Sequence, residues 1–138
     1  ASSMIVSTRG RYALRVLLDL AEHRNAGYTP MKKIAKRQEL PLKYLEQIMP
    51  VLVKNNMIAG VHGKGGGYKL TRSPEQYRIG DILRLTEGDL APVACLSSKA
   101  TPCSRAAECR TLAMWQNFNM LTNAFFDGIT ISDLLAEE

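Results

Sequence analysis

The sequence lacks any long apolar run, and this absence limits the classes of protein it can be. No stretch of about 18 consecutive apolar residues occurs, which excludes a membrane-spanning helix. Lys, Arg and Asp are scattered through the N-terminal segment, so we do not expect a secretory signal peptide. The 138 residues therefore predict a soluble, cytoplasmic protein with one compact domain, or a domain plus an arm.

Cysteine and histidine are both scarce. The three cysteines all fall between Cys95 and Cys109, and an odd, clustered set indicates thiols kept reduced in a cytosol rather than a disulfide framework. The two histidines, His23 and His62, lie far in sequence from these cysteines, and no acid–base pair has a catalytic spacing. We therefore expect that the protein is not an enzyme.

Charge is present but unevenly distributed. The chain has 18 basic and 13 acidic side chains, a net charge of +5 and a pI near 9.3. Residues 1–78 hold 14 Lys/Arg against 5 Asp/Glu, a net +9, whereas residues 79–138 hold 4 against 8, a net −4. Phosphate neutralisation and counterion release drive nucleic-acid association, so the basic part predicts a nucleic-acid-binding surface.

Apolar residues at helical spacing predict a mostly α-helical chain with one small β-hairpin. Thr29 is expected to cap the second helix with Pro30 at its first position, and Thr130 with Asp133 to cap the last. The expected helices span Ser7 or Thr8 to Arg24, Met31–Gln38, Leu42–Asn55, Ile79–Thr86, Glu108–Phe126, and a final turn or two through Leu135.

Residues 31–52 have the pattern of a helix-turn-helix. Ala35 is the small residue where the two helices would touch, and the apolar residues around it would set the crossing angle. The second helix would then present polar residues to the major groove of DNA, namely Lys43, Tyr44, Glu46 and Gln47. An ordinary helical hairpin is the alternative.

Two residues depart from the usual helix-turn-helix pattern. Glu39 occupies the turn where glycine is common because the backbone there favours positive φ. Pro50 removes a hydrogen bond to the Glu46 carbonyl, so the second helix is expected to kink or end early.

A glycine run separates two β-compatible segments, Ile58–Val61 and Tyr68–Thr71. The run 63–67 lacks the Gly-Lys-Ser/Thr ending of a phosphate loop, and no helix follows it. A wing fits better, because a glycine-rich tip can approach the DNA backbone closely while His62 and Lys64 supply charge. A surface turn without a DNA contact is the alternative.

The cysteines have the spacing Cys95-x7-Cys103-x5-Cys109. Structural zinc sites use closer cysteine pairs, whereas three thiolates on an irregular segment suit an iron–sulfur cluster with one further ligand still to be supplied. Incidental or core cysteines are the alternative.

The last long predicted helix carries a wide apolar face. Met114, Phe118, Leu121 and Phe125 recur at spacings of four, three and four. Such a face often belongs to a core, but in a small chain it also predicts pairing with a second copy, which would place two recognition helices on successive major grooves.

Together, Ser7-Thr8-Arg9-Gly10-Arg11-Tyr12-Ala13-Leu14, Tyr44-Leu45-Glu46-Gln47, the run from Gly63 to Leu70 and the cysteine set resemble the bacterial winged-helix regulator family that includes IscR, NsrR and CymR. The resemblance runs from Met4 to Leu135. It implies a winged helix-turn-helix over residues 4–78, followed over residues 79–138 by a sensor loop and a long dimerisation helix.

The resemblance also implies roles for individual residues. It implies base reading by Lys43, Glu46 and Gln47, phosphate contacts by Arg9 and Arg11, wing contacts by His62 and Lys64, and a cluster, either 2Fe-2S or 4Fe-4S, on Cys95, Cys103 and Cys109. The family often has arginine where this chain has His62. It also has ligands where this chain has Leu112 and Arg11, so the fourth ligand is unidentified.

The hypothesis from the sequence is a homodimeric repressor that binds a palindromic operator in double-stranded DNA and senses iron–sulfur, iron or redox status. Two alternatives remain open. One is a cluster-free thiol or zinc sensor that uses the same cysteines, and the other is a repressor of cysteine metabolism controlled by a metabolic-enzyme partner.

Overall fold

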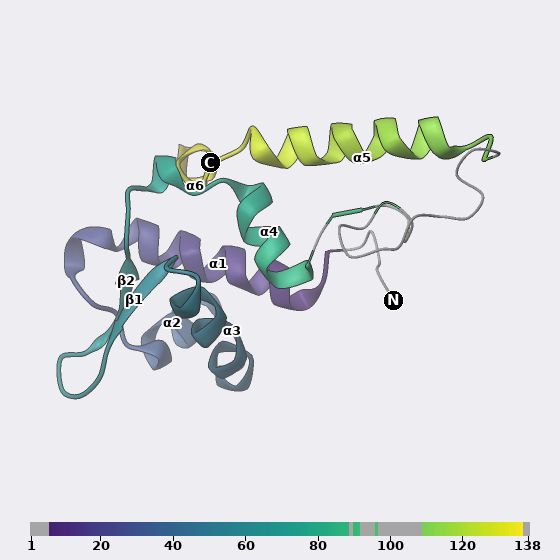
Figure 1. Ribbon diagram of the computed structural model, residues 1–138. Coiled ribbons are helices and arrows are strands. Elements are labelled where there is room, and N and C mark those ends of the chain that lie inside the picture. The colour runs from purple at the N-terminus through teal and green to yellow at the C-terminus, as the bar shows by residue number, and fades with distance from the viewer. Residues whose placement is uncertain (1–5, 89, 92–95, 97–108, 137–138) are drawn as a thin grey trace.

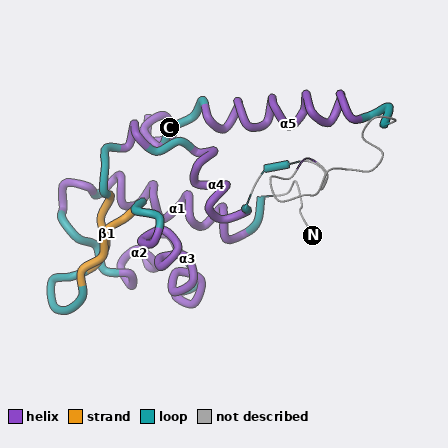
Figure 2. Tube along the Cα trace, viewed as in Figure 1, coloured by secondary structure: helices purple, strands orange, loops and turns teal. Residues whose placement is uncertain are grey.

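A computed structural model describes residues 6–88, 90–91, 96 and 109–136. It shows a helical body with a two-stranded hairpin on one side and a long helix on the other (Figures 1 and 2), which confirms the predicted class of a mostly helical winged-helix protein. The elements are α1 (Thr8–Glu22), η1 (Arg24–Ala26), α2 (Met31–Gln38), α3 (Leu42–Lys54), β1 (Ile58–Val61), β2 (Gly67–Leu70), η2 (Pro74–Gln76), α4 (Ile79–Glu87), α5 (Leu112–Asp127) and α6 (Ile131–Ala136).

The helix α1 is the centre of the hydrophobic core. Its buried face contacts α2, α3, α4, α6 and β2. Of the two residues that the sequence offers as its cap, Ser7 and Thr8, it is Ser7 whose hydroxyl caps it, by accepting a hydrogen bond from the Gly10 amide at 3.3 Å. Each large apolar side chain buried here contributes about 1.5–3 kcal/mol relative to exposure. The buried residues of α1 are Gly10, Ala13, Val16, Leu17, Asp19, Leu20 and Ala21.

A fully buried carboxylate joins α1 to the end of α2. Arg37 donates to Asp19 through Nε at 3.0 Å and Nη2 at 2.6 Å, and the Gln38 amide donates to the same carboxylate at 3.0 Å. This hydrogen bonding raises the pKa of Arg37. Arg15 donates to the Gln38 carbonyl. Because both partners of the charge pair are hydrogen-bonded, the buried charge is compensated and α2 is held in one orientation.

The turn between α2 and α3 uses a left-handed residue, as predicted. Glu39 has φ 53° and ψ 45°, and the Leu40 amide donates to the Ala35 carbonyl at 2.9 Å, which closes α2. A left-handed conformation costs a residue with a side chain about 1 kcal/mol. Burial of Leu40 offsets this cost.

Of the two outcomes expected at Pro50, a kink or an early end, the early end of the second helix is wrong. The helix α3 continues through Pro50 to Lys54. Ile48, Met49 and Leu52 are buried around the proline and hold the helix in place. Glu46, whose carbonyl loses its helical partner, is exposed, so water can replace the missing hydrogen bond.

The expected capping of α2 is also wrong. Pro30 itself is the N-cap residue, without a side-chain cap hydrogen bond, and Thr29 belongs to the wing. Thr29 and Tyr68 exchange two backbone hydrogen bonds of 2.8 Å, so Thr29 adds a bridge to the outer edge of β2. A side chain at Gly67, where φ is 145°, would come within 2.4 Å of the Thr29 backbone, which explains the glycine. β2 therefore starts at Gly67, one residue earlier than expected.

The hairpin and the C-terminal helices are joined through Tyr77. This buried side chain donates from its hydroxyl to the Met57 carbonyl at 2.6 Å and accepts from the Thr71 amide at 3.0 Å. The Ile131 amide donates to the Tyr77 carbonyl at 3.0 Å, which returns α6 to the body.

The last two helices agree with the sequence in type and differ at one boundary. Thr130 and Asp133 form the predicted reciprocal cap of α6, with hydrogen bonds of 2.9 and 3.1 Å. The helix α5 begins at Leu112 after a turn, and Glu108, where the sequence predicts its start, lies outside the described residues.

We predict that Asp19→Ala lowers the free energy of unfolding by about 2–3 kcal/mol, because Arg37 and Gln38 lose their buried acceptor. Urea denaturation followed by circular dichroism measures the loss. Asp81→Ala is the matched control, since this exposed carboxylate pairs with Arg84 at the surface and its loss costs less than about 1 kcal/mol. Equal losses for the two variants would contradict the bracing role of Asp19.

Candidate nucleic-acid interface

The exposed face of α3 carries the residues that the sequence singled out. Lys43, Tyr44, Glu46 and Gln47 are all exposed, whereas the buried residues of α3 are Leu45, Ile48, Met49 and Leu52. In Figure 1, α2, α3 and the hairpin tip lie on the side of the body opposite α5. A helix with its first turns exposed in this way can enter the major groove of DNA.

The start of α1 lies against the start of α3. Tyr12 and Tyr44 meet edge to face, with ring centroids 5.4 Å apart, and the Arg15 guanidinium lies 5.7 Å from the Tyr12 ring centroid. This contact places the exposed residues Arg9 and Arg11 on the helix end next to the recognition helix. Arg11 donates to the Thr8 hydroxyl at 3.1 Å, which leaves its charge at the surface.

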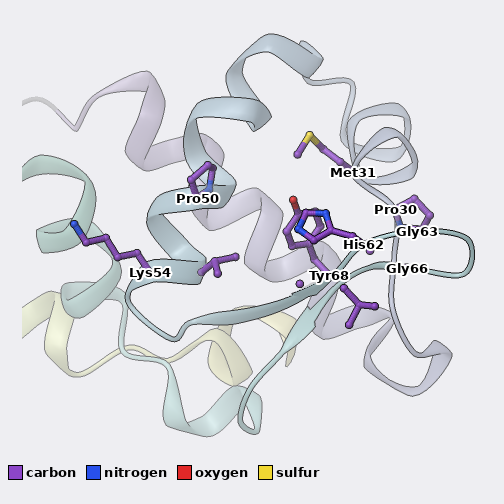
Figure 3. A pocket seen from close by; sticks show the side chains of 12 residues that line it. Pro30, Met31, Pro50, Lys54, His62, Gly63, Gly66 and Tyr68 are labelled. Carbon is purple, nitrogen blue, oxygen red and sulfur yellow. The ribbon is translucent and has the colours of Figure 1, made fainter.

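The hairpin tip carries His62 and Lys64, and both are exposed. The tip closes with a hydrogen bond from the Gly66 amide to the Gly63 carbonyl at 3.0 Å. A cleft of about 590 Å³ separates the hairpin from the second half of α3. Figure 3 shows His62 and Tyr68 on one side of it and Pro50 on the other, so the wing is attached to the body at its base and its tip extends outward.

Sequence reasoning did not single out three residues at this interface. Tyr12 joins α1 to the recognition helix, and only its place one residue after Arg11 could have drawn attention to it. Lys32 and Lys33 are exposed in the first turn of α2. Two cations next to a helix N-terminus, where the helix dipole favours anions, are the signal that could have found them.

Of the three cysteines, the structure describes only one. Cys109 is exposed in the turn before α5, with its Sγ 3.4 Å from the Thr111 hydroxyl oxygen. Cys95 and Cys103 lie outside the described residues. Within the described part of the chain, no three His, Cys, Asp or Glu side chains gather where they could hold a metal ion. Leu112, where the resemblance implies a ligand, is a half-buried apolar residue at the start of α5.

These features define the class of the protein. An exposed recognition helix, a basic helix end beside it and a glycine-rich wing on one compact body are those of a winged-helix DNA-binding transcriptional regulator. The chain belongs to the Rrf2 family, described as iron-dependent transcriptional regulators, whose family model matches residues 6–137.

Relatives and solved structures agree with this membership. The regulator IscR of Aliivibrio salmonicida is 31% identical to this chain, over 97% of this chain's length and 79% of the relative's length. IscR of Sodalis glossinidius is also 31% identical, over 98% of this chain's length and 81% of the relative's length. The structure of T. potens IscR matches with a TM-score of 0.73 at 34% identity, covering 95% of this chain and 85% of that one. The structure of CymR of B. subtilis, the global cysteine regulator, matches with a TM-score of 0.77 at 31% sequence identity and covers 96% of both chains.

Two expectations from the sequence can be judged from these findings. The relatives are named as transcriptional regulators, so the chain is a regulator and not an enzyme, as predicted. No helix among the described residues is long and apolar enough to cross a membrane.

Proposed function

We propose that the protein is a homodimeric repressor that binds a palindromic operator and acts in the cytoplasm. The observation that carries this proposal is the contact of α1 with the exposed start of α3, with the hairpin tip on the same side of the body as α3. Residues 4–78 would supply this face, and residues 79–138 would supply sensing and dimerisation.

The chemistry of each exposed side chain suggests its role on DNA. Lys43 and Gln47 would donate to base edges, and Glu46 would accept from a cytosine amine. Tyr44, held by Tyr12, would pack beside the backbone. Cations at the helix end and the wing tip would contact phosphates and the minor groove, namely Arg9, Arg11, His62 and Lys64.

The proposed dimer interface is the apolar face of α5. Met114, Leu121 and Phe125 are 53%, 68% and 63% exposed, and a shallow groove beside them is lined by Phe118 and Phe126. No residue of α5 is buried by the rest of the described chain. A face this apolar on a helix that extends from the body fits a second copy, because two such faces are self-complementary around a two-fold axis.

The proposed sensor is an iron–sulfur cluster held by Cys95, Cys103 and Cys109. Support comes from the three-thiol set, from the exposure of Cys109, and from membership in a family described as iron-dependent. When bound, the cluster would supply redox and iron sensitivity. A group other than Leu112 must complete the site, so we expect the fourth ligand to come from the partner copy or a small molecule.

A cluster-free thiol or zinc sensor is the second candidate. It would use the same three cysteines without iron. The likeness to CymR, a global cysteine regulator, instead supports the other alternative, a repressor of cysteine metabolism controlled by a protein partner. Elemental analysis of the purified protein separates the two candidates.

We predict that Lys43→Ala weakens binding to an operator selected from random duplexes by at least about tenfold, the cost of losing a base contact. Lys54→Ala is the matched control, because it removes the same charge from the same helix about 16 Å further along the axis. Fluorescence anisotropy at fixed salt measures both. Equal weakening by the two variants would place the DNA elsewhere, and failure of the wild type to distinguish the operator from random duplex would reject the repressor.

We predict that protein purified without air contains iron and sulfide and shows a charge-transfer absorption band. Replacing all three cysteines by alanine should abolish both and change operator affinity at least about fivefold, a coupling of about 1 kcal/mol. A colourless, iron-free wild type whose affinity equals that of the triple variant would contradict the sensor while leaving the repressor intact.

We predict that Leu121→Glu converts the dimer to a monomer, because it buries a charge in the proposed interface. Sedimentation velocity measures the change. Gln116→Glu is the control, since it adds the same charge on the opposite, exposed side of α5 and should leave the dimer intact. A dimer that survives Leu121→Glu would show that the two copies associate through another surface.

A further inference from the structure

The long helix α5 is joined to the DNA-binding body near its C-terminal end. Figure 1 shows its N-terminal half extending away from the body, while its last turns lie against α4. The Ile79 amide donates to the Ile129 carbonyl at 2.9 Å just beyond the helix. Among the described residues, the contacts that can set the direction of α5 therefore include those of its last two turns with α4.

One arginine on α4 holds those last two turns. Arg84 Nη2 donates to Asp127 Oδ2 at 2.8 Å and to Asn123 Oδ1 at 2.8 Å, and its Nε donates to the same Asn123 oxygen at 3.3 Å. The Asn123 amide in turn donates to the Asn119 carbonyl at 2.8 Å and to its side-chain oxygen at 3.0 Å, which orients the Asn123 oxygen toward Arg84. A planar guanidinium bound to two residues one turn apart fixes direction as well as distance.

The packing around Asp127 depends on a glycine. A side chain at Gly80, on the first turn of α4, would place its first carbon 2.0 Å from Asp127 Oδ1. With glycine at this position, the carboxylate lies against α4 within reach of Arg84, whereas a Cβ would require it to shift. The hydrogen bond from Arg84 lowers the pKa of Asp127, so the carboxylate stays ionised at neutral pH.

We propose that Arg84, Asn123 and Asp127, together with Gly80, form a joint that fixes the angle of α5 and so the operator spacing that the dimer accepts. This inference rests on the proposed dimer through α5. The helix is about 24 Å long, so a change of 10° at the joint moves its far end by about 4 Å. This displacement is comparable to the rise of one base pair, about 3.4 Å. The joint is thus a positioning device and makes no contact with DNA.

Two variants open the joint in different ways. Arg84→Met removes the guanidinium and keeps an unbranched apolar stem. Gly80→Ala removes no polar group, but its methyl displaces the Asp127 carboxylate. It does not weaken α4, because alanine has the higher helix propensity. Asp81→Asn is the matched control, since Asp81 also pairs with Arg84, at 3.3 Å, but lies on α4 itself.

Two measurements test the joint, one with DNA and one without. The first is affinity for the selected operator and for operators with two base pairs added or removed between the half-sites, which rotates one half-site by about 70°. For the second, Lys54 is replaced in both copies by a ketone-bearing residue that carries a nitroxide label. The distribution of distances between the two labels is then measured by electron–electron resonance in the dimer without DNA. Sedimentation velocity checks that each variant still dimerises, and affinity for a single half-site checks that its DNA-binding surface is unchanged.

We expect the wild type to lose about thirtyfold or more in affinity on altered spacing and to show one narrow distance distribution. Arg84→Met and Gly80→Ala should each reduce the affinity lost on altered spacing to less than about threefold and at least double the width of the distance distribution. Dimerisation and affinity for a single half-site should stay unchanged in both variants, and Asp81→Asn should behave like the wild type. An unchanged width and spacing penalty in both variants would overturn the joint, as would a broad distribution in the wild type. A wild type that dimerises with a narrow distribution but binds no operator would refute the proposed function alone.

Discussion

The buried face of α1 is the constraint on which the rest of the structure depends. This one helix packs against the recognition unit, the base of the wing and both α4 and α6, so the DNA-facing side and the C-terminal helices share a single core. The Asp19 carboxylate, fully buried and hydrogen-bonded by Arg37 and Gln38, adds direction to this packing. A hydrophobic contact alone tolerates sliding, whereas a compensated buried charge permits one register of α2 on α1.

This shared core explains how two regions of opposite charge can act together. The basic part of the chain presents cations around α3, and the acidic part supplies α4, which contacts α1 on one side and α5 on the other. Glu87, the last residue of α4, accepts hydrogen bonds from the Ser7 amide at 2.9 Å and hydroxyl at 2.6 Å, at the start of the helix that carries Arg9 and Arg11. The segment with the cysteines begins just after Glu87.

Local sequence signals predicted the elements well and their contacts less well. Apolar spacing located every long helix, and the positive φ at Glu39 followed from its place in the turn. Pro50 was misjudged because the packing of its buried neighbours outweighs one lost hydrogen bond, and such packing has no local signature. The pairing of Thr29 with Tyr68 and the contact of Tyr12 with Tyr44 join residues more than 30 positions apart, so no periodicity could predict them. The site residues on α3 were accessible from its amphipathic pattern, whereas the direction of α5 depends on Arg84, which looks like any surface arginine in the sequence.

The central claim is that two copies present α3 and the wing to successive turns of DNA. Methylation interference on an operator selected from random duplexes tests it most directly, because the reagent marks guanine N7 in the major groove and adenine N3 in the minor groove. We expect two symmetric clusters of major-groove interference about 10 base pairs apart, or a multiple of this, each with minor-groove interference on one side from the wing. A single cluster, or interference confined to one groove, would contradict it.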